Sequence, residues 1–180
     1  YDIQQAHAIH VTDEYISGKI ATRPGVLFSS SIEIDITFKG KSSHIAFPQK
    51  GKNALNALRS FMDVIEKYPQ NYNSPIIFGI GQVESGSARN VIPEYAKLQG
   101  TLRTERMSMA KDFLGDVNNI LNGIESSFGV KTELDLGAKY REVTNNPDLY
   151  KSFSQVIPEN NFTNCEMKMT AEDIGYFSAK

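Results

Sequence analysis

The feature that most constrains this chain is a regular change of hydrophobic period between residues 31 and 136. Apolar and polar side chains alternate strictly along residues 31–40, and the apolar set is Ile32, Ile34, Ile36 and Phe38. A period of two is typical of a strand with one buried face and one solvated face. Residues 95–104 and 130–136 alternate in the same way, and the apolar run 76–83 has the length of a strand.

Two segments between these strands have a helical period instead. Residues 54–68 place their apolar side chains on one stripe, after Asn53 as a predicted N-cap and before Pro69 as a predicted stop. The second helix is predicted to start at Ser108 and to end at Gly129. Its apolar face carries Phe113, Val117, Ile120, Leu121, Ile124 and Phe128.

The resulting order is strand, helix, strand, strand, helix, strand. Because each alternating strand has one polar face, both helices must cover the same apolar face of the sheet. The sequence therefore predicts an α+β unit of the ferredoxin-like, split βαβ type over residues 29–142, with a four-stranded antiparallel sheet and two helices on one face.

The segments on either side of this unit follow a different pattern. Residues 6–11 are a short strand candidate, and Asn146 followed by Pro147 predicts the start of a helix that ends before Pro158. A further strand is expected over the alternating residues Cys165, Met167 and Met169, and Thr170 is expected to cap a last helix. We therefore expect residues 1–28 and 143–180 to be strips of a larger α/β domain, mostly outside this chain, into which the central unit is inserted.

Composition excludes several classes of protein. No apolar run approaches the roughly 18 residues that a membrane span needs. The net charge of −2 gives no basic footprint for nucleic acid, and the third strand lacks the stacking aromatics of RNA-binding sheets, since Tyr95 stands only at its start. One cysteine, Cys165, fits a reducing compartment, so we expect a cytoplasmic protein. A non-catalytic dimerisation or small-molecule-binding module stays open as an alternative.

The residues alone do not reveal an enzyme. The three histidines, His7, His10 and His44, are not spaced as metal-site motifs. On these grounds His10 is a core histidine in a strand, and His44 is a solvated loop residue. Asn90 would be an ordinary loop cap, and Glu172 and Asp173 would be first-turn acids.

Five segments taken together change this interpretation. They resemble, in order and with matching spacing, the dimetal amidohydrolases of the aminoacylase and carboxypeptidase group. The segments are AIHV, GKIATRPGVLFSSS, ITFKGKSSHIAFPQKGKNAL, GSARNVIPEYAKLQGTLRT and MTAEDIGYF.

The resemblance implies a catalytic domain that holds two divalent metal ions (zinc, manganese, cobalt or nickel) and an inserted lid through which two subunits form a homodimer. It implies that His10 is a metal ligand and that His44 reaches the active site of the partner subunit. It further implies that Asn90 and Arg103 recognise substrate, and that Glu172 and Asp173 line the pocket.

The implied reaction is metal-assisted hydrolysis of an N-acyl amino acid, with His44 steadying the oxyanion. N-Acetyldiaminopimelate, on the route to lysine, is the expected substrate, and a hippurate-type acyl amino acid is the alternative. The other metal ligands and the general-base glutamate are expected outside this chain, so the chain is expected to be an inactive piece. Two departures leave the substrate contacts open: Ser42-Ser43 replaces the family's Gly-Gly, and Gln49 replaces a histidine.

Overall fold

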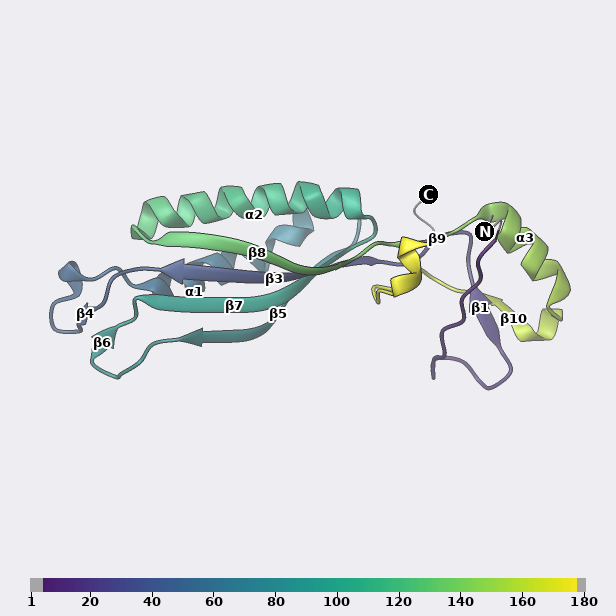
Figure 1. Cartoon of the computed structure of the whole chain (residues 1–180), viewed down its shortest axis with the longest axis horizontal. Helices are drawn as coiled ribbons and strands as arrows, with labels where there is room; N and C mark the ends of the chain where they lie inside the picture. Colours follow the sequence, from purple (N-terminus) through teal and green to yellow (C-terminus); the bar gives the residue numbers. More distant parts are fainter. Residues whose placement is uncertain (1–4, 178–180) are drawn as a thin grey trace.

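This computed structural model describes residues 5–177. Strand β3 (Ser30–Lys39) is an inner strand of its four-stranded sheet. It pairs antiparallel with β7 (Tyr95–Thr104) on one side and with β8 (Lys131–Tyr140) on the other. Strand β5 (Ile76–Ser85) lies beyond β7, so the order is β5-β7-β3-β8, as Figure 1 shows. This is the strand order of the split βαβ unit, and the predicted α+β fold is confirmed.

Two helices cover one face of this sheet. Helix α1 (Ala54–Ile65) starts where the Asn53 side chain accepts a hydrogen bond from the Asn56 amide at 3.1 Å. Helix α2 (Met107–Phe128) ends at Gly129, whose left-handed φ of 63° suits a residue without a Cβ. Both of these boundaries were predicted correctly. Pro69 is not the stop of α1, because α1 ends at Ile65 and the proline lies in the 3₁₀ turn η2 (Tyr68–Asn71).

The core lies between the helices and the apolar face of the sheet. Phe38 of β3, Phe61 of α1 and Phe113 of α2 have no exposed surface, and the apolar set of β3 predicted above is buried with them. The opposite face is polar. There the Asp35 carboxylate accepts a hydrogen bond from Gln99 at 3.0 Å and pairs with Lys97 at 2.7 Å. Both contacts lower the pKa of the Asp35 carboxyl below its ordinary value, and the contact with Lys97 has the larger effect.

The flanking segments pair with one another at one end of the molecule. Strand β1 (Ile20–Thr22) lies parallel to β10 (Phe162–Asn164), and β2 (Gly25–Phe28) lies antiparallel to β9 (Val143–Asn145). Helix α3 (Pro147–Val156) begins as predicted, because the Asn146 side chain accepts hydrogen bonds from two following amides. The 3₁₀ turn η3 (Glu159–Asn161) leads into β10.

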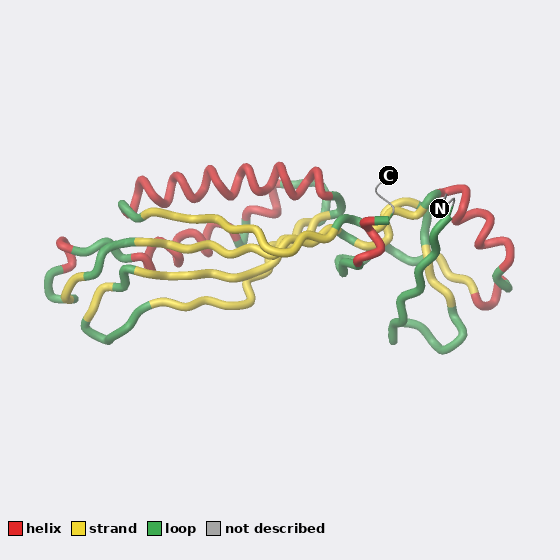
Figure 2. The backbone as a smooth tube through the Cα atoms, in the orientation of Figure 1, coloured by secondary structure: helices red, strands yellow, loops and turns green. Residues whose placement is uncertain are grey.

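Three predictions about the flanks are wrong. Residues 6–11 form no strand, and loops make up much of this end of the molecule (Figure 2). The alternating segment 165–169 is not a strand either, because β10 ends at Asn164 and only Lys168 makes a single bridge, to Phe28. The last predicted helix is reduced to the 3₁₀ turn η4 (Asp173–Tyr176).

The far end of the sheet carries a small structured tip. Strand β4 (Ser43–His44) pairs antiparallel with β6 (Val91–Ile92), and the 3₁₀ turn η1 (Pro48–Lys50) follows β4. Figure 1 shows β4 and β6 at one end of an elongated molecule and β1, β10 and α3 at the other. In the part of the chain that the structure describes, no helix is both long and apolar enough to cross a bilayer.

Candidate functional site

The predicted site residues fall into two clusters at opposite ends of the sheet. The first cluster lies at the tip, where His44 pairs with Val91 and the following amide, that of Ile45, donates to the Asn90 carbonyl at 2.9 Å. The structure therefore brings His44 and Asn90 together, although 46 positions separate them in the sequence. Both side chains are exposed.

A backbone contact determines which nitrogen of His44 carries its proton. The amide of Ala46 donates to His44 Nδ1 at 3.1 Å, so Nδ1 is the acceptor. A neutral imidazole that accepts at Nδ1 carries its hydrogen on Nε2. Nε2–H of His44 is then a donor that no described part of the chain uses, since residues 5–177 offer it no hydrogen bond.

The loop that holds His44 is more ordered than the sequence predicts. Lys41 and Lys52 exchange backbone hydrogen bonds of 2.9 and 2.8 Å across its base. A Cβ on Gly40 would lie 2.0 Å from the Lys52 carbonyl oxygen, so the two sides of the base are in direct contact. From the residues alone, His44 is expected to be a solvated loop residue. In the structure, His44 has the Ala46 amide and the Phe47 ring, 6.2 Å away between centroids.

The second cluster lies at the end formed by the flanking segments. His10 Nδ1 is 3.1 Å from Glu172 Oε1, and the His10 ring meets the edge of Phe28 at 5.8 Å. The His10 side chain is 51% exposed, so the described residues do not bury it as a core histidine. Glu172 is the N-cap residue of η4, which starts at Asp173, so the turn positions a carboxylate beside the histidine.

This pairing fits a histidine that binds a metal ion. Ligand histidines commonly direct one ring nitrogen to a carboxylate, which fixes the ring and leaves the other nitrogen for the metal. Here Glu172 takes Nδ1, which leaves Nε2 free for such a ligand bond. Residues 5–177 contain no group of three or more His, Cys, Asp or Glu side chains that could hold an ion. His10 can therefore supply one ligand to a site whose other ligands are not among the described residues.

Arg103 belongs to the same end of the molecule as His10. It pairs with Ser31 near the start of β3, and its Nη1 donates to the Met169 carbonyl at 2.9 Å. Three residues after Met169 stands Glu172, the partner of His10. The tip lies at the opposite end of the sheet. At about 3.3 Å per residue, the length of β3 puts roughly 30 Å between the two ends.

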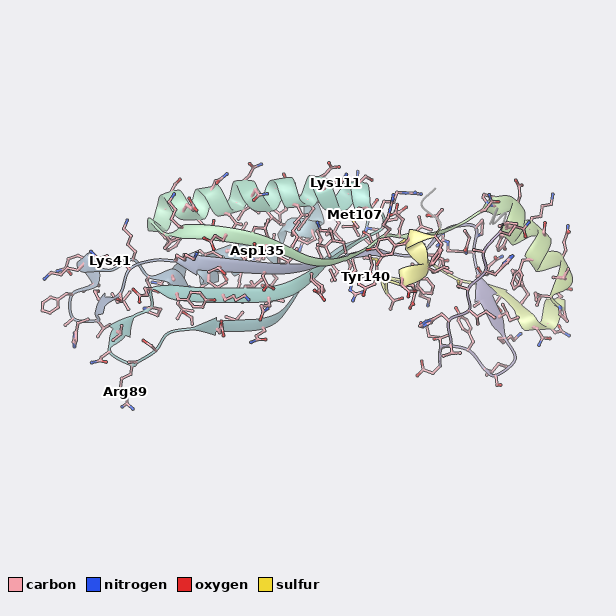
Figure 3. The ribbon with its side chains drawn as sticks, viewed as in Figure 1. Lys41, Arg89, Met107, Lys111, Asp135 and Tyr140 are labelled. Carbon is pink, nitrogen blue, oxygen red and sulfur yellow. The ribbon has the colours of Figure 1, made fainter. Side chains whose placement is uncertain are left out.

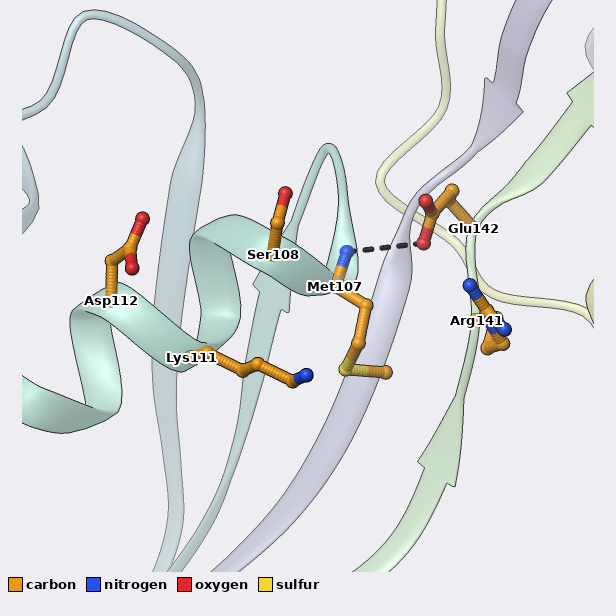
Figure 4. A pocket seen from close by; sticks show the side chains of 6 residues that line it. All are labelled: Met107, Ser108, Lys111, Asp112, Arg141 and Glu142. Atoms are coloured by element: carbon orange, nitrogen blue, oxygen red, sulfur yellow. Dashed lines mark hydrogen bonds between the residues drawn. The ribbon is translucent and has the colours of Figure 1, made fainter. Parts of the chain in front are cut away.

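Sequence reasoning missed the residue that joins the sheet unit to the flanking segment. Helix α2 starts at Met107 without a side-chain cap from Arg106 or the predicted Ser108. Instead, Glu142 accepts from the Met107 amide at 3.0 Å, as Figure 4 shows. An acid near a helix N-terminus is a recognisable signal, but Glu142 stands 35 positions after Met107, so the sequence does not link the two residues.

A hollow of about 510 Å³ surrounds this junction. It contains none of the predicted site residues. Its lining is Met107, Ser108, Lys111, Asp112, Arg141 and Glu142 (Figure 4).

Comparison with known proteins assigns the unit that carries the tip. Residues 29–127 match the family model described as the peptidase dimerisation domain of the M20 group. The N-acetyldiaminopimelate deacetylase of Exiguobacterium sibiricum is 36% identical over 98% of this chain and 49% of its own length. That of Geobacillus sp. is 33% identical over 96% and 48%. The chain thus spans about half the length of these curated relatives.

Two solved structures share the fold. A putative aminohydrolase from methicillin-resistant Staphylococcus aureus has a TM-score of 0.83 at 20% identity, over 94% of this chain and 46% of that one. A protein from Bacillus subtilis, described as a dinuclear metal-binding peptidase of the M20 family, has a TM-score of 0.78 at 19% identity, over 95% and 44%. The dimerisation-domain match covers more than half of the 180 residues, and the chain belongs to the M20 peptidase family.

Proposed function

We propose that this chain is part of a metal-dependent amidohydrolase that removes the acyl group from an N-acyl amino acid. The substrate we propose is N-acetyldiaminopimelate, which would give acetate and diaminopimelate for lysine biosynthesis in the cytoplasm. The names of the relatives support this choice, since those at 36% and 33% identity are both N-acetyldiaminopimelate deacetylases.

The proposed division is a lid and dimerisation domain at residues 29–142 between two strips of catalytic domain, residues 1–28 and 143–180. The pairing of β1 with β10 and of β2 with β9 supports it, because each pair joins one strip to the other. The amide of Ser29 also donates to the carbonyls of Lys168 and Thr170 at 3.0 and 2.9 Å, so the lid starts where the strips meet.

One observation carries the proposal: the two histidines with assigned roles lie at opposite ends of one chain. His10 is at the strip end beside Glu172, and His44 is at the tip, roughly 30 Å away along β3. A single subunit with this arrangement cannot bring them to one substrate. A homodimer can, if the tip of each lid reaches the strips of the other subunit.

In this proposal each residue has one task. His10 would be one ligand of a divalent ion, with Glu172 orienting its ring, and that ion would supply Lewis-acid polarisation of the amide carbonyl. Nε2–H of His44 donates to the oxygen on which negative charge develops, because Nδ1 is already an acceptor. Asn90, next to His44, and Arg103, near His10, contact the substrate from the two sides.

Two alternatives remain distinct from this proposal. Another acyl group, of the hippurate type, would leave every residue role unchanged. A non-catalytic dimerisation or small-molecule-binding module is the alternative of another class, and the match of residues 29–127 to a peptidase dimerisation domain fits it.

The full-length protein tests the proposal through His10. Replacement His10→Ala should lower both the metal content, measured by plasma emission spectrometry, and the release of acetate from N-acetyldiaminopimelate. The matched variant His7→Ala alters a histidine of the same segment that has no assigned role. Unchanged metal content and turnover in His10→Ala would remove His10 from the site, and a full-length protein without amide hydrolysis would leave the dimerisation module.

A further inference from the structure

The loop that carries His44 has an excess of positive charge, and the one acid that hydrogen-bonds its backbone in the described residues is Glu94, which accepts from the Ser42 amide at 3.3 Å. Residues 39–52 contain four lysines and no acidic residue. Lys39 pairs with Glu133 at 2.5 Å. The ammonium of Lys52 lies against Gly129, where it meets the C-terminus of α2, since an added Cβ there would be 2.2 Å from Lys52 Nζ. Lys41 and Lys50 remain, and neither has an ion pair with any residue that the structure describes.

Lys50 differs from Lys41 because an aromatic ring fixes its position. Its Nζ lies 4.9 Å from the centroid of Phe47, in a cation–π contact. The Phe47 ring in turn lies 6.2 Å from the His44 ring, so the imidazole and the ammonium lie against the same aromatic side chain. Figure 3 places Lys41 at the same end of the molecule.

Backbone contacts hold this group of side chains together. The amide of Phe47 donates to the His44 carbonyl at 2.8 Å, and the amide of Lys50 donates to the Phe47 carbonyl at 3.1 Å. Ser43 Oγ donates to the same Phe47 carbonyl at 3.1 Å. The backbone of Lys50 is therefore held at a defined place relative to His44, and the contact with the Phe47 ring positions its ammonium.

Two large apolar side chains beside His44 are exposed to solvent. Phe47 is 50% exposed and Ile45 is 56% exposed. If the tip closes over the partner subunit's substrate, both Phe47 and Lys50 lose water. Removing water from an ammonium that has no counter-charge costs free energy, and a carboxylate beside the ammonium offsets that cost.

We propose that Lys50, seated on Phe47, binds a second carboxylate of the substrate, remote from the amide that is hydrolysed. The ligand class is an acyl amino acid with a carboxylate at each end, and diaminopimelate is such a compound. The inference rests on the proposed function, because it needs the tip of one subunit over the substrate of the other. It adds a residue that selects between substrates with the same scissile amide.

Two substrates that differ only in that carboxylate test the inference. Nα-Acetyl-lysine is N-acetyldiaminopimelate with the remote carboxylate replaced by hydrogen. In the full-length enzyme, Lys50→Met should lower the ratio of kcat/KM for the dicarboxylate to that for Nα-acetyl-lysine about tenfold. The loss should fall on KM, because a contact remote from the reacting bond is equally strong in the ground and transition states. Lys50→Arg keeps the charge and the ring contact, and should retain most of the ratio.

The control is Lys41→Met, which removes the same charge from the same tip at a lysine without the ring contact. Its ratio should stay close to that of the wild type. An equal fall in Lys41→Met and Lys50→Met would mean general attraction by a basic tip and would overturn the contact. An unchanged ratio in Lys50→Met would overturn it as well. If the wild-type enzyme hydrolyses neither substrate, the proposed function itself fails, which is a different result.

Discussion

The replacement Gly51→Ala should reduce turnover roughly tenfold while it costs only about 1 kcal/mol of stability. Gly51 packs at the base of the tip, where an added Cβ would lie 2.7 Å from Ser43 Oγ, 3.1 Å from the Lys41 carbonyl oxygen and 3.2 Å from Ile92 Cδ1. Its φ of −101° and ψ of 170° are ordinary extended values, so alanine adds no backbone strain. The whole effect is therefore steric, and it falls first on Ser43, the residue before His44.

The contacts set the expected magnitudes. Ser43 Oγ must move from the Cβ, which breaks its 3.1 Å hydrogen bond to the Phe47 carbonyl at a cost of about 1 kcal/mol. In a protein of this size or larger, that lowers the melting temperature by about 2–4 °C. The Lys41 carbonyl and Ile92 must also yield by a few tenths of an ångström, and His44 moves with them. A misplacement of 1 Å can cost about a hundredfold in rate, so we expect a loss of roughly tenfold in kcat.

The assay is acetate release by the full-length enzyme, together with thermal unfolding. Gly115→Ala is the matched control, because Gly115 lies in α2 and nothing lies within 4 Å of its added Cβ. It should stabilise the protein by about 0.5–1 kcal/mol and leave turnover unchanged. Full turnover in Gly51→Ala would refute the view that the tip is a rigid support for His44.

Three further predictions concern the lid. Phe113→Ala should lower the free energy of unfolding by about 3–5 kcal/mol in denaturant titration, because the ring is fully buried; a loss below about 1 kcal/mol would contradict that packing. Asn53→Ala should cost about 1 kcal/mol through loss of the α1 cap, whereas an unchanged midpoint would mean that water replaces it. Hydrogen bonds from the Thr132 amide and Lys131 lower the pKa of Glu125, so its contribution is present above about pH 4.3 and is lost as pH falls through the lowered pKa. Glu125→Gln should therefore destabilise the lid at pH 7 and not below the lowered pKa; an equal deficit at both pH values would contradict this.

The sheet unit could be predicted from the sequence because its signals are local. The alternation in β3 reflects burial by helices of the same unit. Asn53 and Gly129 each cap the adjacent turn of their own helix. The strand order follows once both helices must cover one face. The start of α2 could not be predicted, because its cap comes from Glu142.

The flanks could not be predicted because their signals are not local. The apolar residues Ile9 and Val11 suggest a strand, yet they are 95% and 87% exposed, and no described segment supplies a paired backbone for residues 6–11. His10 shows the same limit: its partner Glu172 stands 162 positions later. The role of His44 was a matter of resemblance, whereas the proton on Nε2 follows only from the Ala46 contact.

The central claim is that His44 of one subunit works on the substrate of the other. Two full-length variants test it most directly: one carries His44→Ala, and the other carries His10→Ala. Each alone should lose most of its activity, the first with its metal content intact. When they are mixed under conditions that exchange subunits, a heterodimer contains one working site, built from the intact strips of the first variant and the intact tip of the second. Acetate release should then recover to a substantial fraction of the wild-type rate. No recovery, although native mass spectrometry shows that heterodimers form, would contradict action across the dimer.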